Sequence, residues 1–133
     1  MLTKNLSVPN KAWRWIAVIW TLIIAVLCMV RFTDLPDVGV KGTDKYVHAT
    51  FHFFFTIFWC QHLINTKSRP LRPTLLRVLL LSIVYGGLIE IAQETLTTTR
   101  HADWADVAAN FTGAILAVLV LTIFHWRKEK SPQ

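Results

Sequence analysis

The chain has 133 residues, of which 53% are hydrophobic and 17% charged, with a mean hydropathy of +0.43. This composition is too apolar for a soluble domain of this length, and the apolar residues come in blocks rather than on one face of each element. The net charge of +6 does not indicate nucleic acid binding, because the basic residues gather at the ends of the apolar blocks.

Four apolar blocks approach the length of a bilayer, since a helix needs about 20 residues to cross the hydrocarbon. We therefore predict an all-α integral membrane bundle of four transmembrane helices that forms a single domain over residues 1–133. The predicted spans cover residues 13–31, 45–64, 75–94 and 104–126. The alternative, a soluble bundle of buried helices, is disfavoured because four such runs fill most of the chain.

The basic residues predict the orientation of this bundle. Ten of the fourteen lie before or at the start of the first span, between or just inside the second and third, or after the fourth: Lys4, Lys11, Arg14, Lys67, Arg69, Arg72, Arg77, Arg127, Lys128 and Lys130. Loops rich in Lys and Arg stay in the cytoplasm. We expect both termini and the 65–74 loop to be cytoplasmic.

The first span begins with Trp13 and Trp15, which suit the aromatic belt at a membrane interface. The run ends without a small-residue cleavage site, so we predict an uncleaved span rather than a signal peptide. Residues 33–44 form a turn-rich outer loop. The two cysteines, Cys28 and Cys60, are expected in opposite leaflets, too far apart for a disulfide.

The second span starts at Asp44, a good N-cap residue. At about 100° per residue, Asp44, His48, His52, Phe55 and Trp59 share one face of this helix. Its many aromatic residues are best explained by lipid contact and helix packing. The inner loop at 65–74, which contains two prolines, then leads to the third span.

The third span has a polar face composed of Ser82, Gly86, Glu90, Gln93 and Thr97. The glycines below Glu90 allow a neighbouring helix to approach closely. Glu90 itself is expected several ångströms below the outer headgroups, where a carboxylate is costly unless it is paired or protonated.

The fourth span opens on the most polar entry into any of the apolar blocks. Asp103, Asp106, Asn110, Gly113 and Ala117 fall within roughly 80° of arc on a helix. Small residues recur every four positions at Ala109, Gly113 and Ala117, a pattern typical of tight helix packing in membranes.

Three helices thus place polar residues at the same outer level, and seven of the eight acidic residues lie there. Intramembrane ionisable groups are functional candidates, so we predict a ligand-binding site at this end. Its residues are Asp44, Lys45, His48, Glu90, Gln93, Arg100, Asp103, Asp106 and Asn110. A purely structural network, in which Lys45 and Arg100 neutralise the acids, remains the alternative.

The ordered set Asp44-Lys45-x-x-His48, Glu90-x-x-Gln93 and Arg100-x-x-Asp103-x-x-Asp106-x-x-x-Asn110-x-x-Gly113 resembles the signature of the VanZ-like family. These small bacterial membrane proteins are named for a component associated with resistance to teicoplanin-type glycopeptides. The resemblance implies a multi-pass protein of the bacterial plasma membrane with a role in the cell envelope. It does not supply an enzymatic activity.

Three functions are compatible with such a site. The first is binding of a membrane lipid, a lipid-linked cell-wall intermediate or an amphiphilic glycopeptide, with Arg100 and Lys45 holding a phosphate or carboxylate. The second is an enzyme that acts on an envelope lipid headgroup, with Glu90, His48, Asp103 and Asp106 as catalytic candidates. A proton-coupled transporter ranks last, because no span has a buried acid at its inner end.

A metal variant of the enzyme would use His48, His52 and Asp103 or Asp106. A histidine pair at this spacing is common by chance, so we predict neither a metal nor another cofactor. The oligomeric state is left open.

Overall fold

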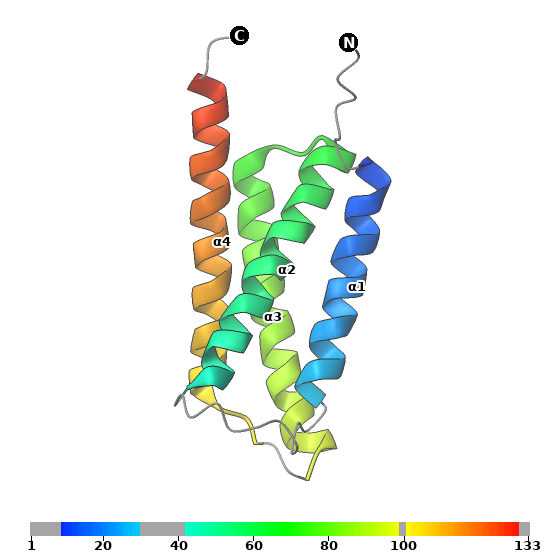
Figure 1. Ribbon diagram of the computed structural model, residues 1–133, viewed down its shortest axis with the longest axis vertical. Helices are drawn as coiled ribbons and strands as arrows, with labels where there is room; N and C mark the ends of the chain where they lie inside the picture. Colours follow the sequence, from blue (N-terminus) through cyan, green and yellow to red (C-terminus); the bar gives the residue numbers. More distant parts are fainter. Residues whose placement is uncertain (1–8, 30–41, 99–100, 131–133) are drawn as a thin grey trace.

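The computed structural model describes residues 9–29, 42–98 and 101–130. Four helices run alternately up and down: α1 (Asn10–Met29), α2 (Thr43–Lys67), α3 (Leu71–Leu96) and α4 (Trp104–Lys130). Figure 1 shows that α1 begins and α4 ends at the same end of the bundle. The predicted all-α class is confirmed.

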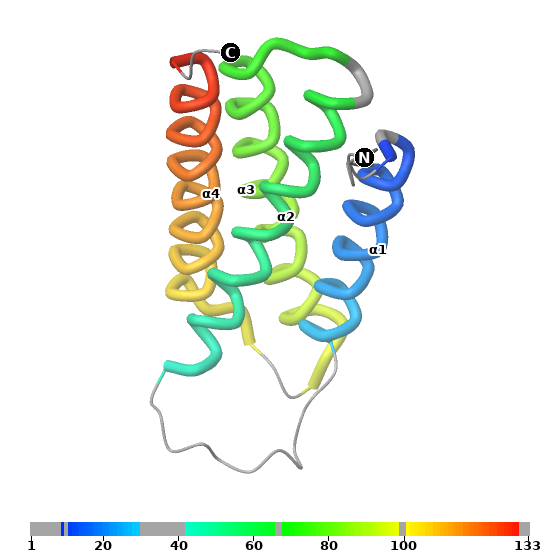
Figure 2. The backbone as a smooth tube through the Cα atoms, turned by 45° about the horizontal axis from the view of Figure 1, so that its top comes forward, coloured from blue at the N-terminus to red at the C-terminus, as the bar shows by residue number. Residues whose placement is uncertain are grey.

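The helix α2 lies at the centre of the bundle and contacts all three others, most extensively α4. The helix α3 also contacts all three, whereas α1 does not contact α4 within the described residues. We call the end where α1 and α3 finish and α2 and α4 begin the acidic end, and the opposite end the basic end (Figure 2). The predicted site falls at the acidic end.

The side chains are distributed as expected for a protein whose surroundings are lipid. Large apolar residues such as Leu22, Val84 and Phe124 are more than half exposed, while His52, Gln93 and Asn110 are buried. Three helices, α1, α3 and α4, are long and apolar enough to cross a membrane. The chain is therefore a helical membrane protein with its polar groups turned inward.

Small residues allow α2, α3 and α4 to approach one another closely. A Cβ atom on Gly113 of α4 would overlap the carbonyl oxygen of Ala49 on α2. A Cβ on Gly86 of α3 would lie 2.9 Å from Asn110 Nδ2 and 3.1 Å from His52 Cε1. The close packing predicted at these two glycines is confirmed, whereas Gly87 has open space where its Cβ would lie.

Two apolar clusters hold the helices together on either side of the bundle centre. Toward the acidic end, Ile24, Cys28, Phe55 and Ile89 pack together, and the rings of Phe55 and Tyr85 stack 5.2 Å apart. The second cluster consists of Cys60, Leu75, Val78 and Leu121. Neither Cys28 nor Cys60 is in a disulfide bond, as expected from their separation.

Two local predictions are wrong. Asp44 does not cap α2; the cap is Gly42, with φ +88°, and Asp44 lies in the first turn. The inner loop is much shorter than residues 65–74, because α2 continues to Lys67 and α3 begins at Leu71. Pro73 interrupts nothing there, since the N–H groups of a first helical turn have no partner within the helix.

Candidate functional site

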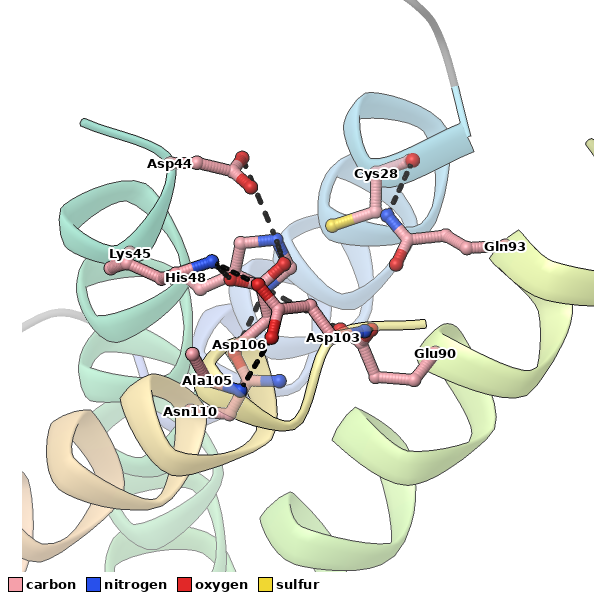
Figure 3. A network of polar contacts seen from close by, with 10 residues as sticks. All are labelled: Cys28, Asp44, Lys45, His48, Glu90, Gln93, Asp103, Ala105, Asp106 and Asn110. Carbon is pink, nitrogen blue, oxygen red and sulfur yellow. Dashed lines mark hydrogen bonds and ion pairs between the residues drawn. The ribbon is translucent and has the colours of Figure 1, made fainter. Parts of the chain in front are cut away.

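Four buried polar residues from three helices meet at the acidic end (Figure 3). They are His48 of α2, Glu90 of α3, and Asp106 and Asn110 of α4, each no more than 4% exposed. Buried polar groups of this kind are costly unless they are paired. The paths of the three helices and the glycine contacts one to two turns deeper bring them together.

Lys45 joins α2 to the start of α4 through two aspartates. Its Nζ lies 2.5 Å from Asp103 Oδ2 and 2.6 Å from Asp106 Oδ1. The hydrogen bond from Lys45 lowers the pKa of Asp103 below its usual value. Lys45 is thus already engaged with two carboxylates, instead of facing outward to receive an anion.

His48 occupies the centre of the site, and each of its ring nitrogens has a different environment. Its Nδ1 lies 3.2 Å from Asn110 Oδ1 and 3.9 Å from Glu90 Oε1. Its Nε2 faces two carboxylate oxygens, Asp106 Oδ2 at 3.7 Å and Asp44 Oδ1 at 3.9 Å. Glu90 thus lies within ion-pair reach of His48, at the long end of that range.

The backbone at the start of α4 points its N–H groups toward carboxylates. Glu90 Oε2 accepts a hydrogen bond of 3.1 Å from the N–H of Asp103, and Glu94 Oε2 accepts one of 2.9 Å from the N–H of Ala102. Asp103 caps the helix, since its Oδ1 accepts a 2.8 Å bond from the N–H of Ala105. Negative charge is stabilised at a helix N-terminus, so this end of α4 favours the buried Glu90.

Two residues expected near the site are directed elsewhere, and a third lies outside the described residues. Gln93 donates from Nε2 to the carbonyl oxygen of Cys28 at 2.9 Å, which ties α3 to the end of α1. His52 lies one turn deeper than His48, and its Nδ1 is 2.7 Å from Ser82 Oγ. Arg100 is the residue outside the described ranges.

A groove between α3 and α4, which we did not predict from the sequence, opens beside the buried carboxylates. Its volume is about 350 Å³, and its lining residues are Ile83, Gly87, Glu90, Ile91, Ala102, Asp103, Trp104 and Val107. A second hollow of about 410 Å³ shares Ile83, Trp104 and Val107 with it and reaches Gly86 and Asn110. The missing side chain of Gly87 was the one signal in the sequence.

The described residues at the acidic end carry a large excess of negative charge. Five carboxylates gather there (Asp44, Glu90, Glu94, Asp103 and Asp106), whereas Lys45 is the one lysine or arginine of the described chain at this end. Clustered carboxylates repel one another unless a cation lies among them. Within the described residues this end therefore carries more carboxylates than cations, and Arg100, predicted at the same end, lies outside those residues.

The fold and the site together define a helical membrane protein with a buried polar centre at one end. No family model matches the chain, and no solved structure matches it. The chain is 26% identical over 108 residues to an uncharacterized protein of Schizosaccharomyces pombe. The aligned region covers 80% of this chain and 63% of the yeast protein, so the chain spans less than two thirds of that relative's length.

Proposed function

We propose that all four helices cross the membrane, with the acidic end outside and both termini in the cytoplasm. The helix α2 has 25 residues, enough for about 37 Å of helix, and it runs alongside three helices that are apolar enough to span (Figure 1). The basic residues at the opposite end support this orientation.

We further propose that the acidic end binds an amphiphilic ligand whose tail lies in the groove between α3 and α4. The observation that carries this proposal is the groove itself, in which an apolar wall ends at the two carboxylates Glu90 and Asp103. Small-molecule sites commonly combine apolar lining with a few placed polar groups. A polar headgroup then sits at the carboxylates while an acyl chain remains in lipid beside Trp104, which is 87% exposed.

The ordered polar residues resemble those of the VanZ-like family, which supports a role in a bacterial cell envelope. The corresponding ligands are a membrane lipid, a lipid-linked cell-wall intermediate or an amphiphilic glycopeptide. On this proposal the protein resides in the bacterial plasma membrane and contributes to envelope function or to glycopeptide and lipoglycopeptide resistance. Phe55 is 2% exposed, so it does not contact an acyl chain in lipid.

The test uses one variant that fills the groove and one that removes the negative charge at its polar end. Gly87 lines the groove, and a Cβ there meets nothing within 4 Å, so Gly87→Leu directs a side chain into the groove. Glu90→Gln keeps an oxygen to accept the bond from Asp103 N–H but removes the charge. We expect each to reduce the lipid that co-purifies in mild detergent, quantified by mass spectrometry, by at least about tenfold.

Val84→Leu and Glu129→Gln are the matched controls. Val84 is 58% exposed on α3 and lines neither hollow, and Glu129 is near the basic end of α4. In cells challenged with a lipoglycopeptide, the two site variants should lose the survival that the wild type and both controls confer at equal abundance. Full lipid retention and survival in Gly87→Leu and Glu90→Gln would leave only a structural role for the polar network.

A second function is an enzyme that acts on the headgroup with Glu90 and His48 in acid–base roles. The approach of Glu90 Oε1 to His48 Nδ1 at 3.9 Å favours it, because both groups are buried beside the same groove. Glu90→Gln separates the two functions when the co-purified lipid is analysed chemically. An enzyme would leave unaltered substrate bound to the variant, whereas a binding protein would lose the ligand.

A further inference from the structure

A hydrogen bond to Asn110 accounts for the position of one ring nitrogen of His48, but not for that of the other. When Nδ1 carries the ring proton and donates to Asn110 Oδ1 at 3.2 Å, the lone pair of Nε2 points away from Asn110. Nε2 then faces Asp106 Oδ2 at 3.7 Å and Asp44 Oδ1 at 3.9 Å. Three such electron-rich atoms repel one another unless a proton or a metal ion lies among them.

Among the described lysines and arginines, Lys45 alone lies at this end. Nε2 makes no hydrogen bond to the described residues, because both carboxylate oxygens lie beyond 3.5 Å. Lys45 bonds the other oxygen of Asp106, Oδ1, at 2.6 Å, and leaves Oδ2 turned toward the imidazole. The donor atoms of Asp44, His48 and Asp106 all lie within 4.8 Å of one another.

We propose that Asp44, His48 and Asp106 bind a divalent transition-metal ion, of which Zn²⁺ is the best fit. Imidazole nitrogen and carboxylate oxygen are both ordinary zinc ligands at about 2.0–2.2 Å. Donors arranged tetrahedrally at that radius lie roughly 3.3–3.6 Å apart, so donors now up to 4.8 Å apart would have to close by about an ångström on binding the ion. This set replaces the pair of His48 and His52 considered from the sequence, since His52 bonds Ser82.

The surroundings of the three ligands match those of a working metal site. A ligating histidine usually donates its second ring N–H to an oxygen that fixes its orientation, and Asn110 occupies that position. His48 and Asp106 are buried, whereas half of the Asp44 side chain is exposed, which leaves a path for the ion and a coordination position for an outside ligand. Figure 3 shows Asp44 on the outward side of His48.

A metal at this place would complement the excess of negative charge at the acidic end. Glu90 lies 3.9 Å from the imidazole and also lines the groove between α3 and α4, so the metal site and the groove adjoin. An ion held here gives an anionic headgroup a positive partner. Lys45 cannot serve as that partner, since it is already paired with Asp103 and Asp106. This use of the ion rests on the proposed function, whereas binding of the ion does not.

The test is a zinc titration of the full chain in detergent, with a histidine-free affinity tag and prior treatment with EDTA. Isothermal titration calorimetry should find one Zn²⁺ per chain for the wild type. His48→Gln, Asp106→Asn and Asp44→Asn should each weaken binding by at least about a hundredfold, and Asn110→Leu by about 10- to 100-fold. Co²⁺ in place of zinc should give the visible absorption bands of a tetrahedral site, and His48→Gln should abolish them.

His125→Gln and Glu94→Gln are the matched controls, because both residues lie outside the trio, and both variants should bind zinc as the wild type does. Should His48→Gln or Asp106→Asn fail to fold, Asp44→Asn still decides, since Asp44 is half exposed. Absence of zinc binding by the folded wild type overturns the proposal, as does unchanged binding in Asp44→Asn or equal loss in the controls. None of these measurements needs lipid, so a failure here leaves the proposed lipid function to its own test.

Discussion

At the scale of single residues, Lys45 shows how one cation serves two carboxylates in different surroundings. The Asp103 side chain is 48% exposed, whereas that of Asp106 is 5% exposed. An exposed ion pair contributes little because water and salt screen it, but a buried carboxylate left without its cation is costly. Lys45 therefore matters chiefly for Asp106, and Asp103 adds a second, weaker anchor and the cap of α4.

The contribution of the Lys45–Asp103 ion pair to stability can be measured by its dependence on pH. Lys45 lowers the pKa of Asp103 in the folded protein below its ordinary value of 3.8. Such a group stabilises the fold above its unfolded pKa, and this contribution disappears as pH falls through the folded pKa. Asp103→Asn keeps a capping side chain and should lower the melting temperature by a few degrees at pH 7. The difference from wild type should shrink below about pH 4.

Thermal unfolding in detergent between pH 3 and pH 7, followed by circular dichroism, gives both curves. Glu129→Gln, near the basic end of α4, should follow the wild type throughout. A difference between Asp103→Asn and wild type that grows on acidification would contradict the assigned role of Lys45.

The sequence predicts which residues share a face of one helix, but not which neighbour that face meets. Helical periodicity brought His48, Glu90, Asp106 and Asn110 to one level, and the structure joins them. The same periodicity placed Gln93 with them, yet Gln93 bonds a backbone carbonyl of α1. A backbone carbonyl leaves no signal in a side-chain pattern, because every residue has one.

At the scale of the elements, the polar character of α2 follows from its position. The helices α1, α3 and α4 each expose an apolar surface, and they surround α2 on several sides. His48, His52 and Thr56 are consequently buried against protein rather than lipid. Hydropathy marks α1, α3 and α4 as apolar enough to cross a membrane, and it does not register that the polar residues of α2 are shielded by its neighbours.

The contact between α2 and α4 depends on the absence of one side chain. Gly113→Ala should lower the free energy of unfolding by about 1–3 kcal/mol, because its Cβ would overlap the Ala49 backbone and force the helices apart. Gly87→Ala is the matched control, with nothing within 4 Å of its Cβ. Replacing a mid-helix glycine there should stabilise by about 0.5–1 kcal/mol. Denaturant titration in mixed micelles measures both, and equal effects would refute the close packing at Gly113.

At the scale of the whole molecule, the four antiparallel helices predict a labelling pattern for the intact membrane. Single cysteines are introduced at Arg69, Thr98 and Lys130 in a background with Cys28→Ala and Cys60→Ala. All three positions are exposed at the ends of the bundle. With four spans and a cytoplasmic basic end, an impermeant maleimide added to spheroplasts should label Thr98→Cys and leave Arg69→Cys and Lys130→Cys unlabelled.

The pattern also distinguishes four spans from three. If α2 remained on the outer side, Arg69→Cys would be labelled, the later helices would reverse, and Thr98→Cys would be protected while Lys130→Cys reacted. Full inversion of the bundle would give the same labelling, with Arg69→Cys and Lys130→Cys labelled. In both arrangements Thr98→Cys would react only after disruption of the membrane. The span of α2, measured by spin-label depth at Phe54, separates these two outcomes. Phe54 is 37% exposed on α2, so its label should lie in the hydrocarbon only if α2 crosses the membrane.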